Sequence, residues 1–144
     1  MRKILLTSVT FFVLGAGSAF AANTNYSTIE QTGSTNIANQ IVSGDSGVNG
    51  NVQDIQQTSN VNTAGQSVTD TGGGGSTDND QHILQDTASQ NYASQTIDSG
   101  NDNEQGSEQH GFSNQSYQAI SNGDGNTQLV TQNGDSNLAT QTVN

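Results

Sequence analysis

The sequence contains no cysteine and almost no basic residues. Of its 144 residues only two are Lys or Arg, namely Arg2 and Lys3, whereas 13 are Asp or Glu. Without cysteine there is no disulfide framework of the kind that holds small secreted proteins together, and no thiolate metal site. The shortage of Lys and Arg excludes nucleic-acid binding through phosphate neutralisation and docking on an anionic membrane surface.

Apolar and aromatic residues are also scarce, at 28% and 5% of the chain. A chain so rich in Gln, Asn, Ser, Thr and Gly is, on composition alone, expected to be disordered and prone to β-aggregation. It has no uninterrupted apolar run of about 20 residues, so no membrane insertion is expected. The one apolar stretch follows the basic start and leads to Ala19-Phe20-Ala21, a small-residue cleavage site. We therefore predict that residues 1–21 are a signal peptide and that the protein is secreted.

An internal repeat changes the expectation of disorder. The pattern N-x-[QS]-x-[IV]-x-Q-x-[GS]-x-x-N-x-[AS]-x-Q-x-[IV] occurs five times, over residues 25–42, 51–68, 79–97, 103–120 and 126–143. The third copy has one extra residue in its middle. Linkers rich in Gly, Asp, Asn and Ser join the copies and are predicted to form outer turns. The repeats continue on both sides of every linker, so residues 22–144 are predicted to form one domain.

The spacing inside each repeat predicts two short strands. Within each half of the repeat, the positions that the pattern specifies are two residues apart, which is the period of a β-strand. A turn that usually contains Gly separates the two halves. Each repeat holds only about three buried apolar side chains, too few to offset the ordering of about eighteen residues. No repeat is therefore expected to fold alone. We predict an all-β fold, a β-solenoid of five strand-turn-strand rungs that stack into cross-β amyloid.

Two sets of inward side chains are expected to carry this assembly. Amide side chains in equivalent positions are predicted to align into a self-assembly ladder: Asn25, Gln31, Asn36, Gln40, Asn51, Gln57, Asn62, Gln66, Gln85, Asn91, Gln95, Gln109, Asn114, Gln118, Asn126, Gln132, Asn137 and Gln141. The predicted apolar interior consists of Ile29, Ala38, Val42, Ile55, Ala64, Val68, Ile83, Ala93, Ile97, Ile120, Val130, Ala139 and Val143.

The fourth repeat and the two ends depart from an ideal solenoid. In the fourth repeat Ser107 and Ser116 replace the two small apolar residues, so this repeat is expected to be the weakest. Soluble solenoids close their ends with atypical polar repeats. Here the first and last repeats fit the pattern, so both are expected to present strand edges to another copy of the chain. Polymerisation is the predicted consequence.

The motif Q-x-G-x-x-N-x-A, seen as QTGSTNIA from Gln31 and QNGDSNLA from Gln132, resembles the curlin repeat of curli fibre subunits. The resemblance covers the five repeats and is closer to the major subunit than to the nucleator. It implies a functional amyloid fibre on the bacterial cell surface, used for adhesion and as biofilm matrix. It also implies two partners besides the chain itself, a nucleator subunit and an outer-membrane export channel.

Other functions find less support in the sequence. The two histidines, His82 and His110, fall at outward positions with no second His, Cys or carboxylate pair at ligand spacing, so no metal or cofactor site and no enzyme activity are expected. A calcium-binding β-roll would need a nine-residue period, whereas these repeats begin 23 to 28 residues apart. A monomeric surface adhesin would need terminal caps. The outward residues Leu129 and Leu138 are candidates for one apolar seam between filaments.

Overall fold

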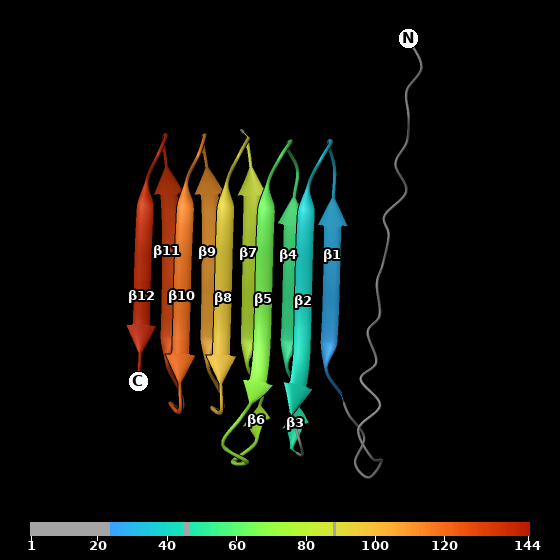
Figure 1. The fold of residues 1–144 in the computed structure, drawn as a ribbon, viewed down its shortest axis with the longest axis vertical. Helices are drawn as coiled ribbons and strands as arrows, with labels where there is room; N and C mark the ends of the chain where they lie inside the picture. Colours follow the sequence, from blue (N-terminus) through green and yellow to red (C-terminus); the bar gives the residue numbers. More distant parts are fainter. Residues whose placement is uncertain (1–23, 45–46, 88) are drawn as a thin grey trace.

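A computed structural model describes residues 24–44, 47–87 and 89–144. The predicted signal peptide lies outside these residues. All regular elements in the described part are β-strands, and strands within each sheet are parallel. Successive repeats stack as the turns of a β-solenoid, so the predicted all-β solenoid is confirmed (Figure 1).

Two five-stranded sheets form the body of the solenoid. The first-half sheet has the order β1-β4-β7-β9-β11 and the second-half sheet the order β2-β5-β8-β10-β12. The strands of the first-half sheet are β1 (Tyr26–Gln31), β4 (Val52–Gln57), β7 (Asp80–Asp86), β9 (Glu104–His110) and β11 (Thr127–Asn133). Those of the second-half sheet are β2 (Ile37–Gly44), β5 (Thr63–Asp70), β8 (Tyr92–Asp98), β10 (Gln115–Ser121) and β12 (Leu138–Val143). We number the rungs 1 to 5 from β1–β2 to β11–β12.

Equivalent positions of successive repeats lie directly above one another. Ile29 pairs with Ile55, which pairs with Ile83, and the same alignment runs through every strand pair. The extra residue of the third repeat falls in the turn between β7 and β8. Both strands of that rung keep the register of their neighbours, because the turn absorbs the insertion.

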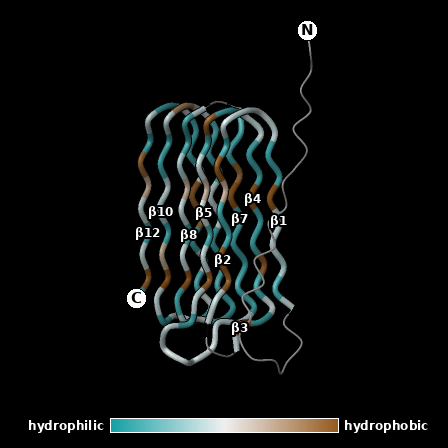
Figure 2. Tube along the Cα trace, turned by 45° about the vertical axis from the view of Figure 1, so that its right-hand side comes forward, coloured by the Kyte–Doolittle hydropathy of each residue, from teal (hydrophilic) through white to brown (hydrophobic). Residues whose placement is uncertain are grey.

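Most of the side chains buried between the two sheets are polar, and hydrophobic residues form only short segments along the strands (Figure 2). One apolar cluster contains Ile55, Ala64, Ile83 and Ala93, with Ile29 and Ala38 packed against it. The second contains Val48, Val68, Ile97 and Ile120, with Val42 and Val143 packed against it. Large and small residues thus face each other across the first cluster, as the alternation within each strand requires.

The first two linkers between repeats contain short strands as well as turns. They form a third, two-stranded parallel sheet of β3 (Val48–Asn49) and β6 (Ser76–Thr77). Val48 is buried in the second apolar cluster, so this linker supplies a core residue. The Gly-rich and Asp-rich composition of the linker predicted only a turn there.

Left-handed backbone conformations end both kinds of turn. On both sides of the solenoid, the residue before every ladder Asn except Asn25 has positive φ: Thr35, Gly50, Val61, Asp78, Gln90, Asp102, Ser113, Gly125 and Ser136. Each places the following Asn at the start of its half-repeat. Val61, with φ of 58°, is the least suited to this position because its branched side chain crowds the backbone.

Replacing Val61 by Asn is therefore expected to stabilise the protein. Asn adopts the left-handed conformation more easily, and Val61 is 45% exposed, so little apolar burial is lost. We expect the free energy of unfolding to rise by about 1 kcal/mol. Urea denaturation of the monomer measures this. The same substitution at Val52, in an extended strand, is the control and should give no increase.

Candidate functional site

Two continuous ladders of glutamine side chains run the length of the solenoid. In the first-half sheet the Nε2 of each Gln donates to the Oε1 of the next, from Gln31 through Gln57, Gln85 and Gln109 to Gln132, at 2.6, 2.7, 2.8 and 2.9 Å. In the second-half sheet the ladder from Gln40 through Gln66, Gln95 and Gln118 to Gln141 has distances of 2.9, 2.9, 2.9 and 3.0 Å.

A third glutamine ladder was missing from the predicted set. It joins Gln53, Gln81, Gln105 and Gln128, each Nε2 donating to the next Oε1 at 2.9 Å. In rung 1 Ser27 takes the place of the glutamine, and its hydroxyl donates to Gln53. The repeat pattern already contained this column at its [QS] position, but the serine in the first repeat obscured it.

Backbone contacts fix the direction of every ladder glutamine amide except that of Gln31. Besides its ladder bond, Gln40 Nε2 donates to the carbonyl of Thr28 on the facing strand, and Gln57 Nε2 donates to the carbonyl of Ile37. A carbonyl can only accept, so the NH₂ group and not the oxygen must point there. All three glutamine ladders therefore donate from rung 1 toward rung 5.

The asparagine ladders run in the opposite direction. Asn51 Nδ2 donates back to Asn25 Oδ1, and the column continues through Asn79 and Asn103 to Asn126. Asn79 and Asn103, absent from the predicted set, are therefore ladder members. In the other column the backbone N–H groups of Asn62, Asn91, Asn114 and Asn137 donate to the Oδ1 of the preceding Asn, beginning at Asn36, at 2.9 to 3.0 Å.

The predicted apolar interior is interrupted at rung 4. Ser107 lies between Ile83 and Val130 in its column, and Ser116 lies between Ala93 and Ala139. Both serines are fully buried and neither hydroxyl has a hydrogen-bond partner. Val130 and Ala139 are thereby cut off from the first apolar cluster. An unsatisfied buried hydroxyl costs stability, which gives a physical reason for the predicted weakness of this repeat.

Filling the interruption is expected to stabilise the monomer. Ser116→Ala removes one unpaired hydroxyl and matches the alanines above and below, and Ser107→Val matches the apolar residues of its own column. We expect about 1 kcal/mol or more from the first change and a further gain from the double variant, measured by urea denaturation. Ser76→Ala is the control: its hydroxyl is equally buried but donates to Gly100 and accepts from Asn79, so its removal should destabilise.

Asp70, at the end of β5, is buried and accepts from the backbone N–H groups of Gly73 and Gly75. The other acidic residues of the strands lie on the outer faces, most of them on that of the first-half sheet. His82 and His110 were predicted to point outward. The Nδ1 atom of each contacts a carboxylate of the preceding rung, that of Asp54 for His82 and that of Asp86 for His110. Burial raises the pKa of Asp86, but hydrogen bonds from Thr87 and His110 outweigh it, so that its pKa lies below the usual value. Among the described residues no three His, Cys, Asp or Glu side chains gather as a metal site.

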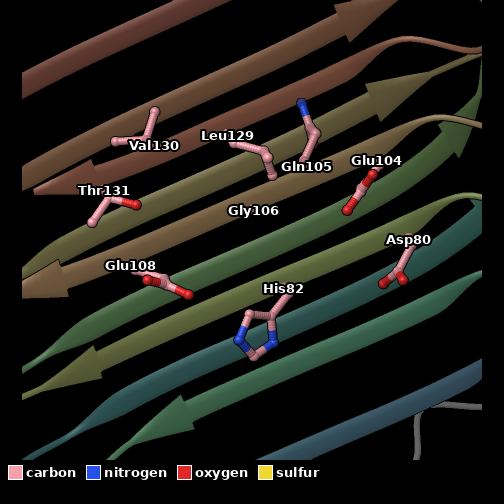
Figure 3. A pocket seen from close by; sticks show the side chains of 9 residues that line it. All are labelled: Asp80, His82, Glu104, Gln105, Gly106, Glu108, Leu129, Val130 and Thr131. Carbon is pink, nitrogen blue, oxygen red and sulfur yellow. The ribbon is translucent and has the colours of Figure 1, made fainter.

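The same face has a shallow hollow at Gly106 (Figure 3). Gly106 stands between His82 and Leu129 in its column and leaves a volume of about 230 Å³ open. Glu104 and Glu108 border it. The hollow is smaller than the roughly 300 Å³ at which ligand pockets begin, and we assign it no ligand.

The two terminal rungs offer complementary hydrogen-bonding groups. Among the described residues, β1 and β2 have no strand beyond them on one side, and β11 and β12 none on the other. At the rung 1 end the glutamine ladders terminate in the Oε1 acceptors of Gln31 and Gln40, because their Nε2 groups are used by rung 2. At the rung 5 end they terminate in the Nε2 groups of Gln132 and Gln141. The asparagine columns end with the reverse polarity, in Oδ1 acceptors at rung 5.

Comparisons with known proteins add no identification, since no protein-family model, no curated protein and no solved structure matches this chain. Within the described residues, no helix has the length and apolar character needed to cross a membrane.

Proposed function

We propose that this chain is a structural subunit of an extracellular, curli-like functional amyloid fibre. Copies add end to end, rung 5 of one against rung 1 of the next, and the fibre serves surface adhesion and biofilm matrix. Residues 1–21 direct secretion. By the curlin resemblance, a nucleator subunit starts the fibre and an outer-membrane channel exports the chain.

The observation that carries the proposal is the match between the two terminal rungs. Stacked in register, Gln132 and Gln141 donate to Gln31 and Gln40 of the next copy, continuing both ladders across the junction. The interior also continues, because Val130 meets Ile29 and Ala139 meets Ala38, in the columns where Ile29 meets Ile55 and Ala38 meets Ala64 inside the chain. A junction between copies then continues both full-length glutamine ladders and the apolar columns of the interior, while Gln128 meets Ser27 in the third ladder column.

The opposed polarities of the ladders make this stacking head-to-tail. Two rung 5 ends brought together would place Gln Nε2 groups against each other, and two rung 1 ends would place Oε1 groups against each other. Each such contact leaves buried polar groups without partners, at about 1–3 kcal/mol apiece. A heterologous interface of this kind does not close on itself but continues as a filament.

Polymerisation kinetics of residues 22–144 test the proposal. We expect thioflavin-positive fibres after a lag that added fibre fragments abolish. The same experiment with calcium and with a chelator separates the alternatives: folding that requires calcium identifies a β-roll. A monomer that stays soluble and folded in both conditions identifies a monomeric adhesin.

A further inference from the structure

The two outer faces of the solenoid differ sharply in charge. The outer face of the first-half sheet carries Glu30, Asp54, Asp80, Asp86, Glu104 and Glu108, together with both histidines. On the outer face of the second-half sheet the one charged residue is Asp98, at the end of β8. We call this second surface the neutral face; it consists of the outward residues of β2, β5, β8, β10 and β12.

The neutral face also exposes apolar and aromatic side chains. Ile37, Ile41 and Leu138 are 61, 44 and 69% exposed. On the adjacent strands β8 and β10 the rings of Tyr92 and Tyr117 pack together with centroids 5.2 Å apart. The outer face of the first-half sheet, which we call the acidic face, exposes Tyr26, Val52 and Leu129 as well. There, however, Val52 pairs with Asp80, and Leu129 borders the same hollow as Glu104 and Glu108. Leu129 and Leu138 therefore lie on opposite faces and cannot form the single seam expected from the sequence.

We propose that the neutral face docks against the neutral face of a second filament of the same chain, so that filaments associate sideways in pairs. This inference rests on the proposed fibre. Beyond residue 3 the chain has no Lys or Arg, so the acidic face has no cationic surface on another copy to meet. Two neutral faces can approach to the roughly 10 Å separation of packed sheets with almost no like-charge repulsion.

The size of the neutral face explains why pairing should follow filament growth. Five strands at about 4.8 Å and about seven residues at about 3.3 Å give each copy about 550 Å². This is below the roughly 800 Å² per partner of a typical stable interface. A single copy is therefore too small to pair, whereas a filament adds the same area with every subunit.

The surface relief of the neutral face fits a two-fold arrangement. Gly65, Ser94 and Tyr117 occupy one column on successive rungs, and a Cβ at Gly65 would meet nothing within 4 Å. A two-fold axis that runs parallel to β8, midway between the two neutral faces, places rung 2 of one copy over rung 4 of the other. Tyr117 of each filament then faces the open space at Gly65 of the other.

Gly65→Glu tests the pairing without disturbing the monomer, since its side chain points outward into open space. We expect wild-type filaments side by side in electron micrographs. The variant should form single filaments at low salt, with about tenfold fewer pairs, and regain pairs at 1 M salt, where charges are screened within about 3 Å. Tyr26→Glu, on the outer face of the first-half sheet beside Val52, has the same charge change and should pair like wild type, as should Gly65→Ser.

Three outcomes separate the two proposals. Single wild-type filaments, or paired Gly65→Glu filaments at low salt, overturn the pairing and leave the fibre intact. A wild-type chain that forms no filaments overturns both. Equal thioflavin growth rates for wild type and Gly65→Glu are expected, because the terminal rungs are unchanged.

Discussion

Gln85→Glu is expected to destabilise the monomer by about 3 kcal/mol or more at pH 7, enough to remove much of the stability of a small domain. Gln85 is fully buried; its Nε2 donates to Gln109 Oε1 and to the carbonyl of Thr63, and its Oε1 accepts from Gln57. The carboxylate keeps only the last of these bonds. Its charge would face two oxygen acceptors in an interior without a cation.

The loss should depend on pH in a defined direction. Burial and the facing acceptors raise the pKa of the new carboxyl above its unfolded value, so protonation on acidification restores a donor and part of the stability. Urea denaturation of Gln85→Glu relative to wild type at pH 7 and pH 4 measures this, with the deficit smaller at pH 4. Gln115→Glu, on the outer face of β10, is the control. Equal deficits for both variants would mean that the ladder contributes nothing.

The double variant Gln132→Glu, Gln141→Glu is expected to stop growth at the rung 5 end. Inside the monomer each new carboxylate still accepts from the ladder residue before it, Gln109 or Gln118, but loses the donation to the carbonyl of Gln115 or Leu129. Toward the next copy each presents oxygen to the Oε1 of Gln31 or Gln40. Two lost contacts of about 1 kcal/mol each raise the monomer concentration left at equilibrium at least about 30-fold.

A small proportion of the same variant, mixed with wild-type protein, should also stop the growth of wild-type fibres. Its rung 1 end is intact, so it can add to the rung 5 end of a wild-type fibre, after which no further copy can follow. Single-fibre microscopy should show growth arrested at one end only. Thr140→Glu, Thr142→Glu makes the same charge change on the outward side of β12, beside uncharged residues, and should not arrest growth. Arrest at both ends, or at neither, would contradict a head-to-tail junction.

The strand pairs of the solenoid could be predicted from the sequence because their side chains repeat with a period of two. That period places Ile29, Ile55 and Ile83 in one column, and the structure has them there. The role of the first linker could not be predicted in this way. Val48 stands among Gly, Ser and Asp residues, and only the stacking of two linkers brings it into the core.

The direction of the ladders was also outside what the sequence could predict. A pattern of amides gives the columns but not which way each NH₂ group points. That choice depends on facing carbonyls such as those of Thr28 and Ile37, each of which lies on the opposite sheet from the glutamine that donates to it. Likewise, the two serines of rung 4 were visible as exceptions to the pattern, but their lack of partners depends on what surrounds them in three dimensions.

The subunit repeat along the fibre tests the end-to-end stacking most directly. If copies join as rungs do, a helical reconstruction of fibres from residues 22–144 should show parallel strands about 4.8 Å apart without interruption, and a rise of about 24 Å per five-rung copy. Fibres with antiparallel strands, or with a break in the strand spacing between copies, would contradict this account.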